Sequence, residues 1–320
     1  IMKNIKKNIR HFFLLSGLAA GCMYGFNKLI ETTSCIKKRL TVQDGYYFEW
    51  RYGKIFYTKQ GTGSPILLIH DLHPASSSIE WNQILKKLAK YHTVYAIDLL
   101  GCGRSDKPNL TYTNYMYVQL ITDFVKKIIQ QKSDLIATGT SCSFSLMAAH
   151  MDDTIFGKLF FISPPSLELL QKNPARQTNW LKKLLELPVI GTFLYNLQMT
   201  EDNIRKTFEK EFYFRKSLIS GNLEDSYYEA AHLDHSGGRF LYGSMIGNYT
   251  NINIIPALKK IEHPIFIIGS RESDASIRIL DSYVKYDEII ETAYVSNCKK
   301  LPQLEVPDKL LEIIRMFYED

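Results

Sequence analysis

Short apolar segments alternate with amphipathic segments along this chain, and the alternation restricts the possible folds more than any other feature. The apolar segments are too short for helices and lack a helical period, which is typical of buried parallel strands. The first three are each followed by a segment with helical spacing of apolar residues. Strands alternating with helices predict an α/β fold, in which right-handed crossovers build a mostly parallel sheet with helices on both faces. The predicted strands lie at residues 64–71, 92–100, 133–140, 158–164, 264–270 and 289–297, with helices at 81–90, 115–130 and 144–150.

Two departures from this rhythm indicate the domain organisation. Before the first parallel strand, aromatic and polar residues alternate around Gly53, which predicts an antiparallel hairpin. Between Pro164 and Pro264 the pattern is helical, with no convincing strand. We expect such an insertion in a parallel sheet to cover the strand ends as a cap. The predicted organisation is an N-terminal segment at 1–40, a core at 41–166 and 259–320, and a helical cap at 167–258.

The N-terminal segment combines basic residues with an apolar run. Residues 3–10 carry Lys and Arg but no acid, and an uninterrupted apolar stretch extends from Phe12 to Phe26. This stretch is shorter than the roughly 20 residues that a spanning helix needs. Snorkelling of Lys28 extends the usable length to Ile30. We therefore expect a single-pass membrane anchor.

Two other interpretations of this segment stay open. Residues 18–22 loosely resemble a lipoprotein cleavage site, as in a cleaved secretory peptide. The segment is also compatible with a buried or interfacial helix. Cations flank the apolar run on both sides, and the closer cluster precedes it. This distribution favours a cytoplasmic N-terminus, with the folded domain on the extracytoplasmic side.

The composition argues against several classes of function. The net charge is +6, but no stripe of the sequence combines dense basic residues with aromatic ones, so we expect no nucleic-acid partner. The five cysteines are widely spaced and form no CxxC pair, which argues against a zinc cluster or a dithiol redox site. No pair of histidines has metal-ligand spacing with acids, so we expect neither a metal nor another cofactor. Protein partners stay undefined.

One segment has the pattern of a nucleophilic serine. The predicted strand at 133–140 runs into Ser141, and a helical segment follows. A strand, a sharp turn and a helix around Gly-x-Ser-x-Gly form a nucleophile elbow, which exposes the serine hydroxyl at the helix N-terminus. Here Gly139 opens the motif and Ser143 replaces its last glycine. We interpret Ser141 as the candidate nucleophile and the Cys142 amide as an oxyanion donor.

Three further motifs accompany this elbow, at residues 66–81, 96–108 and 297–317. Together with the elbow, and in this order, they make residues 46–318 resemble the α/β-hydrolase superfamily, in its esterase- and lipase-like branch with a helical cap. The resemblance implies a serine hydrolase acting on carboxylic esters. It also implies that His70, Asp71 and Leu72 lie in the oxyanion loop, with the Leu72 region supplying a second amide.

The sequence departs from the family pattern at two positions. The family order is serine, acid, then histidine, and Lys300 stands at the histidine position. A lysine with an ordinary pKa of roughly 10.4 has no lone pair at neutral pH to accept the serine proton. The resemblance implies Glu272 or Asp274 as the acid, and a carboxylate beside Lys300 would form an inert ion pair. Asp71 replaces a glycine, and we expect it to cap the following turn and face solvent.

These residues lead to two functional hypotheses. The first is a membrane-associated serine hydrolase acting on an apolar ester or acyl substrate, whose activity is in doubt because Lys300 replaces the histidine. In this hypothesis a cap histidine such as His232 would either reach Ser141 or line the pocket. The second is a non-catalytic pseudo-hydrolase with a degenerate triad, which binds a lipid-like ligand or acts as a scaffold while Lys300 locks the former triad electrostatically.

Overall fold

A computed structural model describes residues 2–40 and 44–319, and the predicted start of the core at residue 41 lies outside them. The described residues form an eight-stranded sheet in the order β1-β2-β4-β3-β5-β6-β7-β8. The first two pairings, β1 with β2 and β2 with β4, are antiparallel, and the others are parallel. The predicted α/β fold is therefore confirmed, including the hairpin around Gly53. The strands are β1 Tyr46–Trp50, β2 Gly53–Gln60, β3 Pro65–Ile69, β4 Thr93–Ile97, β5 Ser133–Thr138, β6 Phe156–Ile162, β7 Ile265–Ser270 and β8 Glu291–Val295.

Helices cover both faces of this sheet, because alternate side chains of each strand point to opposite faces. On one face, Leu67 and Leu135 pack against α3, α4, α11 and α12. On the other face, Leu68 and Ile136 pack against α2 and α14. The covering elements are η1 Ser78–Trp81, α2 Asn82–Leu88, α3 Asn114–Phe124, η2 Val125–Ile129, α4 Ser141–Met151, α11 Ile255–Leu258, α12 Asp274–Val284, α13 Pro302–Glu305 and α14 Pro307–Glu319.

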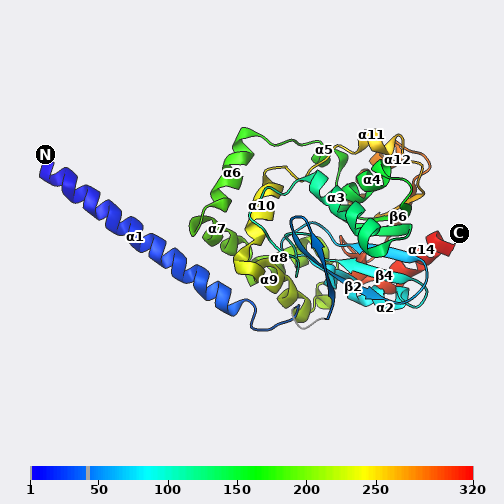
Figure 1. Cartoon of the computed structure of the whole chain (residues 1–320), viewed down its shortest axis with the longest axis horizontal. Helices are drawn as coiled ribbons and strands as arrows, with labels where there is room; N and C mark the ends of the chain where they lie inside the picture. Colours follow the sequence, from blue (N-terminus) through cyan, green and yellow to red (C-terminus); the bar gives the residue numbers. More distant parts are fainter. Residues whose placement is uncertain (1, 41–43, 320) are drawn as a thin grey trace.

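The chain between β6 and β7 is helical in all its regular elements (Figure 1). Some of its buried apolar residues, such as Tyr195, Phe208 and Tyr227, form a cluster apart from the two clusters on the sheet, whereas others, such as Leu170 and Leu241, belong to the core. The cluster around Phe208 contains Leu301 and Leu304 from the core, next to Lys300. The Glu305 carboxylate accepts hydrogen bonds from the backbone N–H groups of Phe214 and Lys299. The helical segment is thus attached to the loop that carries Lys300. Its elements are α5 Leu167–Leu170, α6 Arg176–Glu186, α7 Ile190–Gln198, α8 Glu201–Thr207, η3 Phe208–Phe212, η4 Lys216–Leu218, α9 Gly221–Ser236 and α10 Gly238–Ile246.

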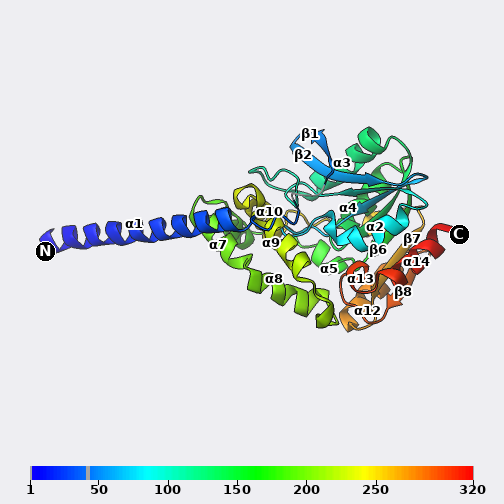
Figure 2. The same cartoon turned by 90° about the horizontal axis from the view of Figure 1, so that it is seen from below.

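The N-terminal segment forms one long helix, α1 (Met2–Thr33), which projects away from the rest of the molecule (Figures 1 and 2). Its part from Phe13 to Thr33 is long and apolar enough to cross a membrane, and none of its most apolar window is buried inside the protein. A signal sequence can have the same length and apolar composition. The predicted long apolar helix is confirmed, and its insertion in a membrane stays a proposal.

Candidate active site

The turn between β5 and α4 is the position where a hydrolase of this fold would carry its nucleophile. Strand β5 ends at Thr138 and helix α4 begins at Ser141, so two residues make the turn. Gly139 has a φ of +55°, and Thr140 is already helical, with a φ of −61°. The residue in the sharp, left-handed conformation of the elbow is therefore Gly139, which has no side chain to act as a nucleophile.

The prediction that Ser141 is an exposed nucleophile is wrong in this structure. Ser141 is completely buried, and its hydroxyl donates a 2.6 Å hydrogen bond to the His70 carbonyl. As the first residue of α4, it lies past the turn and faces the end of β3. The Cys142 N–H is equally unavailable to an oxyanion, because it donates to the Gly139 carbonyl at 3.1 Å.

The space beside Gly139 is filled by the carboxylate of Asp71. Strands β3 and β5 are parallel neighbours in which Ile69 pairs with Ala137, so Asp71 and Gly139 each lie two residues beyond this pair. A Cβ built on Gly139 would overlap the Cγ and both carboxylate oxygens of Asp71. Asp71 Oδ1 accepts the Thr140 N–H at 2.8 Å. This is the amide that follows the elbow residue, so the carboxylate occupies the place of the nucleophile and uses the oxyanion donor next to it.

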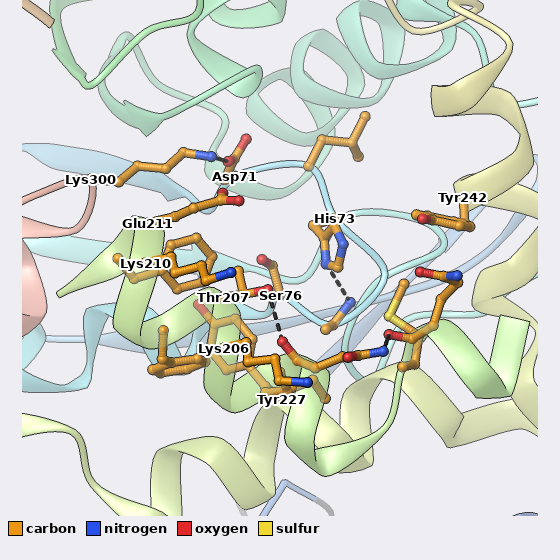
Figure 3. A pocket seen from close by; sticks show the side chains of 18 of the residues that line it. Asp71, His73, Ser76, Lys206, Thr207, Lys210, Glu211, Tyr227, Tyr242 and Lys300 are labelled. Carbon is orange, nitrogen blue, oxygen red and sulfur yellow. Dashed lines mark hydrogen bonds and ion pairs between the residues drawn. The ribbon is translucent and has the colours of Figure 1, made fainter. Parts of the chain in front are cut away.

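Lys300 completes this arrangement from the other side. Its Nζ lies 2.6 Å from Asp71 Oδ2 (Figure 3). Burial alone would raise the pKa of Asp71, but the Lys300 charge and hydrogen bond and the Thr140 N–H outweigh it, so this pKa lies below its usual value. Burial would likewise lower the pKa of Lys300, but the carboxylate of Asp71 holds it above the usual value. Both groups are therefore charged at neutral pH.

Two of our predictions for these residues change. The expectation that Asp71 faces solvent is wrong, because only 9% of the residue is exposed. The expected ion pair at Lys300 does form, but with Asp71, from the oxyanion loop, in place of Glu272 or Asp274. Glu272 is exposed and accepts the Asn297 N–H at 3.0 Å. Asp274 is the exposed first residue of α12.

The histidines in our prediction are engaged elsewhere. His70 is completely buried, with one ring nitrogen 2.7 Å from the Asp71 carbonyl and the other 3.0 Å from the Leu99 N–H, which donates to it. It thus ties β3 to the loop after β4. His232 lies in α9 with its Nδ1 2.7 Å from the Tyr228 carbonyl. Burial lowers the pKa of His232 to about 4. Neither ring is hydrogen-bonded to Ser141, whose hydroxyl binds a carbonyl.

Two cavities share Lys300 and Thr140 among their lining residues. The first, of about 480 Å³, lies under the cap (Figure 3). Asp71 and Leu72 line it together with apolar, aromatic, polar and charged side chains, among them Lys206 and Glu211. The second, of about 600 Å³, lies toward α12 and includes Glu272 among its lining residues. Of the predicted site residues, the structure therefore brings Asp71, Leu72, Glu272 and Lys300 to these cavities, whereas Ser141, Cys142, His70, His232 and Asp274 are not among the residues that line them.

In the described part of the chain, the lining of these cavities does not contain the paired hydroxyl and histidine of a serine hydrolase. Within residues 2–40 and 44–319, none of the hydroxyls that line the two cavities is hydrogen-bonded to a histidine ring, the interaction that activates a serine. His73, the histidine that lines the first cavity, uses its Nδ1 to accept the Ala75 N–H at 3.2 Å. Burial lowers the pKa of His73 to about 4. Lys300 is protonated, so it can donate hydrogen bonds but cannot act as a base.

Sequence reasoning missed Gly139 and Thr140 as site residues, and also Glu211, whose negative charge contributes to the raised pKa of Lys300. A signal for Gly139 was present: it is the one glycine between residues 133 and 150, and glycine is the residue that best tolerates a positive φ. Glu211 comes from the helical cap and lines both cavities, and its pattern in the sequence is that of an ordinary solvated helix.

Comparison with known proteins agrees with this fold. The chain matches curated proteins over parts of their length. A 2-hydroxy-6-oxo-6-(2'-aminophenyl)hexa-2,4-dienoic acid hydrolase of Metapseudomonas resinovorans is 35% identical over 22% of this chain and 24% of that protein. A haloalkane dehalogenase of Mesorhizobium japonicum is 30% identical over 46% of this chain and 47% of that protein. The chain thus spans less than half of the length of either relative.

Solved structures match over most of the chain. An epoxide hydrolase has a TM-score of 0.71 at 18% identity, and covers 86% of this chain and 98% of its own. A carboxylesterase from Bacillus subtilis has a TM-score of 0.67 at 15% identity, and covers 91% and 96%. At these identities the likeness concerns the fold. The model of the Alpha/beta hydrolase family matches residues 66–312, most of the chain, and the protein therefore belongs to the alpha/beta hydrolase family.

Proposed function

We propose that this protein is a non-catalytic member of its family, anchored by α1, which binds a ligand with an apolar body and an acidic head in the cavities beside Lys300. One observation carries the proposal: Gly139 occupies the elbow, and the Asp71 carboxylate, paired with Lys300, fills the space of a nucleophile. Loss of triad members lowers hydrolase rates by about 10⁴–10⁶. The hypothesis of an active serine esterase or lipase therefore gives way to the pseudo-hydrolase hypothesis.

The expected result with a fluorophosphonate probe is no labelling of the full-length chain in detergent, because no serine in the site is activated. A triple variant, Asp71→Gly with Gly139→Ser and Lys300→His, should gain labelling, since it restores a side chain at the elbow, frees the Thr140 amide and supplies a base. Ser141→Ala in the triple background is the matched control and should leave the labelling unchanged. Labelling of the natural chain that disappears in Ser141→Ala would overturn the proposal.

The lining of the first cavity supports the class of ligand. Met199, Ile204 and Phe208 supply an apolar wall, which suits an alkyl or acyl chain. Lys206 and Lys210 line the same cavity, and Lys300 lies at its junction with the second. Asp71 balances Lys300 and Glu211 lines the same cavity, so Lys206 and Lys210 leave one positive charge in excess for an acidic head.

Octanoate is a simple probe of this proposal. It should raise the melting temperature of the full-length chain in nanodiscs, because a ligand that binds only the folded state stabilises it. Octylammonium has the same chain with the opposite charge and should raise it less. Thr207→Trp, which fills the first cavity, should abolish the octanoate effect, while Tyr91→Trp on the far surface should not. Equal shifts with both compounds would contradict the proposed acidic head.

The proposed location follows from α1. Its exposed apolar surface supports a single-pass anchor, and the flanking charges favour an extracytoplasmic domain. The anchor brings the cavities close to a source of apolar ligands, which agrees with the proposed ligand class.

A further inference from the structure

The helix α1 is attached to the cap rather than to the core. The Asn27 side-chain amide donates to the Val189 carbonyl at 2.9 Å and accepts from the Asn196 side chain at 3.1 Å. Phe26 packs edge-on against Phe193 of α7, with ring centroids 5.3 Å apart. Figures 1 and 2 agree that α1 leaves the molecule beside α7. The start of α7 therefore lies at the level where the apolar run of α1 ends.

Large apolar side chains are exposed on the cap at this level. We call Trp180, Leu181, Leu187 and Ile190 the cap stripe. They are 63%, 41%, 45% and 42% exposed, and they extend along α6 to the first residue of α7. Val189, which immediately precedes Ile190, accepts a hydrogen bond from the Asn27 side chain of α1. The end of the cap stripe thus lies next to α1.

Helix α6 buries Leu185 but also exposes large apolar side chains. Lys182 is buried and pairs with Glu186 at 2.5 Å, whereas Trp180 and Leu181 face outward. A helix on a water-exposed surface normally buries its aromatic and aliphatic residues and exposes its lysines. The outward face of α6 is therefore suited to an apolar environment, and Trp prefers the boundary between acyl chains and headgroups.

Cations surround this apolar face. Lys172, Arg176 and Lys183 are exposed on or next to α6, and Lys28 is on α1. Basic residues close to a bilayer surface are attracted by anionic lipid headgroups. Apolar residues combined with flanking cations are the pattern of an interfacial helix.

We propose that the cap stripe lies in the headgroup and upper acyl region of an anionic bilayer, beside the membrane-inserted α1. The occupant of this surface is lipid, because the attachment of α1 through Asn27 fixes α6 and α7 next to the leaflet that α1 enters. This inference rests on the membrane anchor of the proposed function. It adds that the cap, and with it the first cavity, is held against the bilayer in one orientation.

The three tryptophans of the chain make a direct test possible. Trp180 is 63% exposed, whereas Trp50 and Trp81 are buried in the core, so a quencher in the lipid acts selectively on Trp180. The full-length chain is reconstituted into liposomes that contain phospholipids brominated near the headgroup, together with anionic lipid. Brominated lipid should quench the fluorescence, and Trp180→Phe should remove this quenching. In the natural chain, Trp180 should also be protected from quenching by iodide in the aqueous phase.

A second variant controls for position. Tyr91→Trp in the Trp180→Phe background puts an exposed tryptophan after α2, on the part of the molecule remote from α1 (Figure 1), and should be quenched by iodide but not by brominated lipid. Flotation of the liposomes tests the anchor separately. If the chain does not float, the anchor fails. If it floats but brominated lipid leaves Trp180 unquenched, the inference is overturned, either because the stripe faces water or because another protein copy covers it.

Discussion

We expect Gly139→Ser alone to destabilise the protein strongly. The new Cβ would overlap the Asp71 carboxylate, which is held in place by Thr140 and Lys300. Overpacking of this kind costs about 1–3 kcal/mol. A non-glycine residue at a φ of +55° adds about 1–2 kcal/mol. The measurement is the free energy of unfolding of the full-length chain in detergent.

A double-mutant cycle separates these two costs. Asp71→Gly removes the overlap, so the destabilisation by Gly139→Ser should fall to the backbone strain alone, and the coupling between the two changes should reach about 1–3 kcal/mol. Gly221→Ser is the control, because no atom lies near its new side chain. Additive effects of the two substitutions would mean that Asp71 does not occupy the space beside Gly139.

Lys300→Met should also lower stability, and it should reverse the pH dependence of the site. Asp71 would keep the hydrogen bond from the Thr140 N–H but lose Lys300 as its counter-ion. Breaking a buried pair costs about 3–5 kcal/mol, and we expect about 2–3 kcal/mol here because solvent in the cavity reaches Lys300. About a third of the Lys300 side chain, 35%, is exposed.

The sign of the pH effect follows from the pKa of Asp71. In the natural chain this pKa lies below its unfolded value, so the contribution of Asp71 to stability is present at neutral pH and is lost as the pH falls through the folded pKa. Without Lys300, burial raises the pKa, and the variant should become more stable as the pH falls toward it. Asp71→Asn in the Lys300→Met background should abolish this dependence. Lys206→Met, at the same cavity, should be nearly neutral; a similar loss there would assign the effect to the general charge of the cavity.

The fold was predictable because its signals are local. Most predicted strands carry a short apolar run that is typical of burial on both faces of a sheet, as in Ile66–Ile69 of β3 or Ile265–Ile268 of β7. The helical insertion was equally visible as a long interval without such runs. A strand or an insertion of this kind depends on residues that are close together in the sequence, so its pattern can be recognised from the sequence alone.

The position of the elbow was not predictable by motif alone. The Gly-x-Ser pattern starting at Gly139 matches the expected composition, but the structure places the sharp turn at the glycine and the serine inside the helix. The motif specifies only the spacing of residue types. The position of the turn depends on where β5 stops pairing with β6, which is at Thr138. Ser141 then follows as the start of α4, three residues further on.

The Asp71–Lys300 pair lay beyond sequence reasoning for a different reason. Both departures from the family pattern were visible, at Asp71 and at Lys300, but they are separated by more than two hundred residues. Their pairing depends on the adjacency of β3 and β5 and on the loop after β8, which the packing of the cap against Leu301 and Leu304 helps to position. Asp71 and Lys300 look like two independent departures in the sequence, but in the structure their charges neutralise each other.

The overlap between position 139 and Asp71 also constrains how the protein can change over generations. A serine does not fit at position 139 while the carboxylate is present, so the first accepted substitution on a route to a serine there must occur at Asp71. That substitution in turn leaves Lys300 without its counter-ion. Each single substitution toward a serine at position 139 therefore passes through a less stable protein, and this loss of stability separates the present arrangement from one with a hydroxyl at the turn.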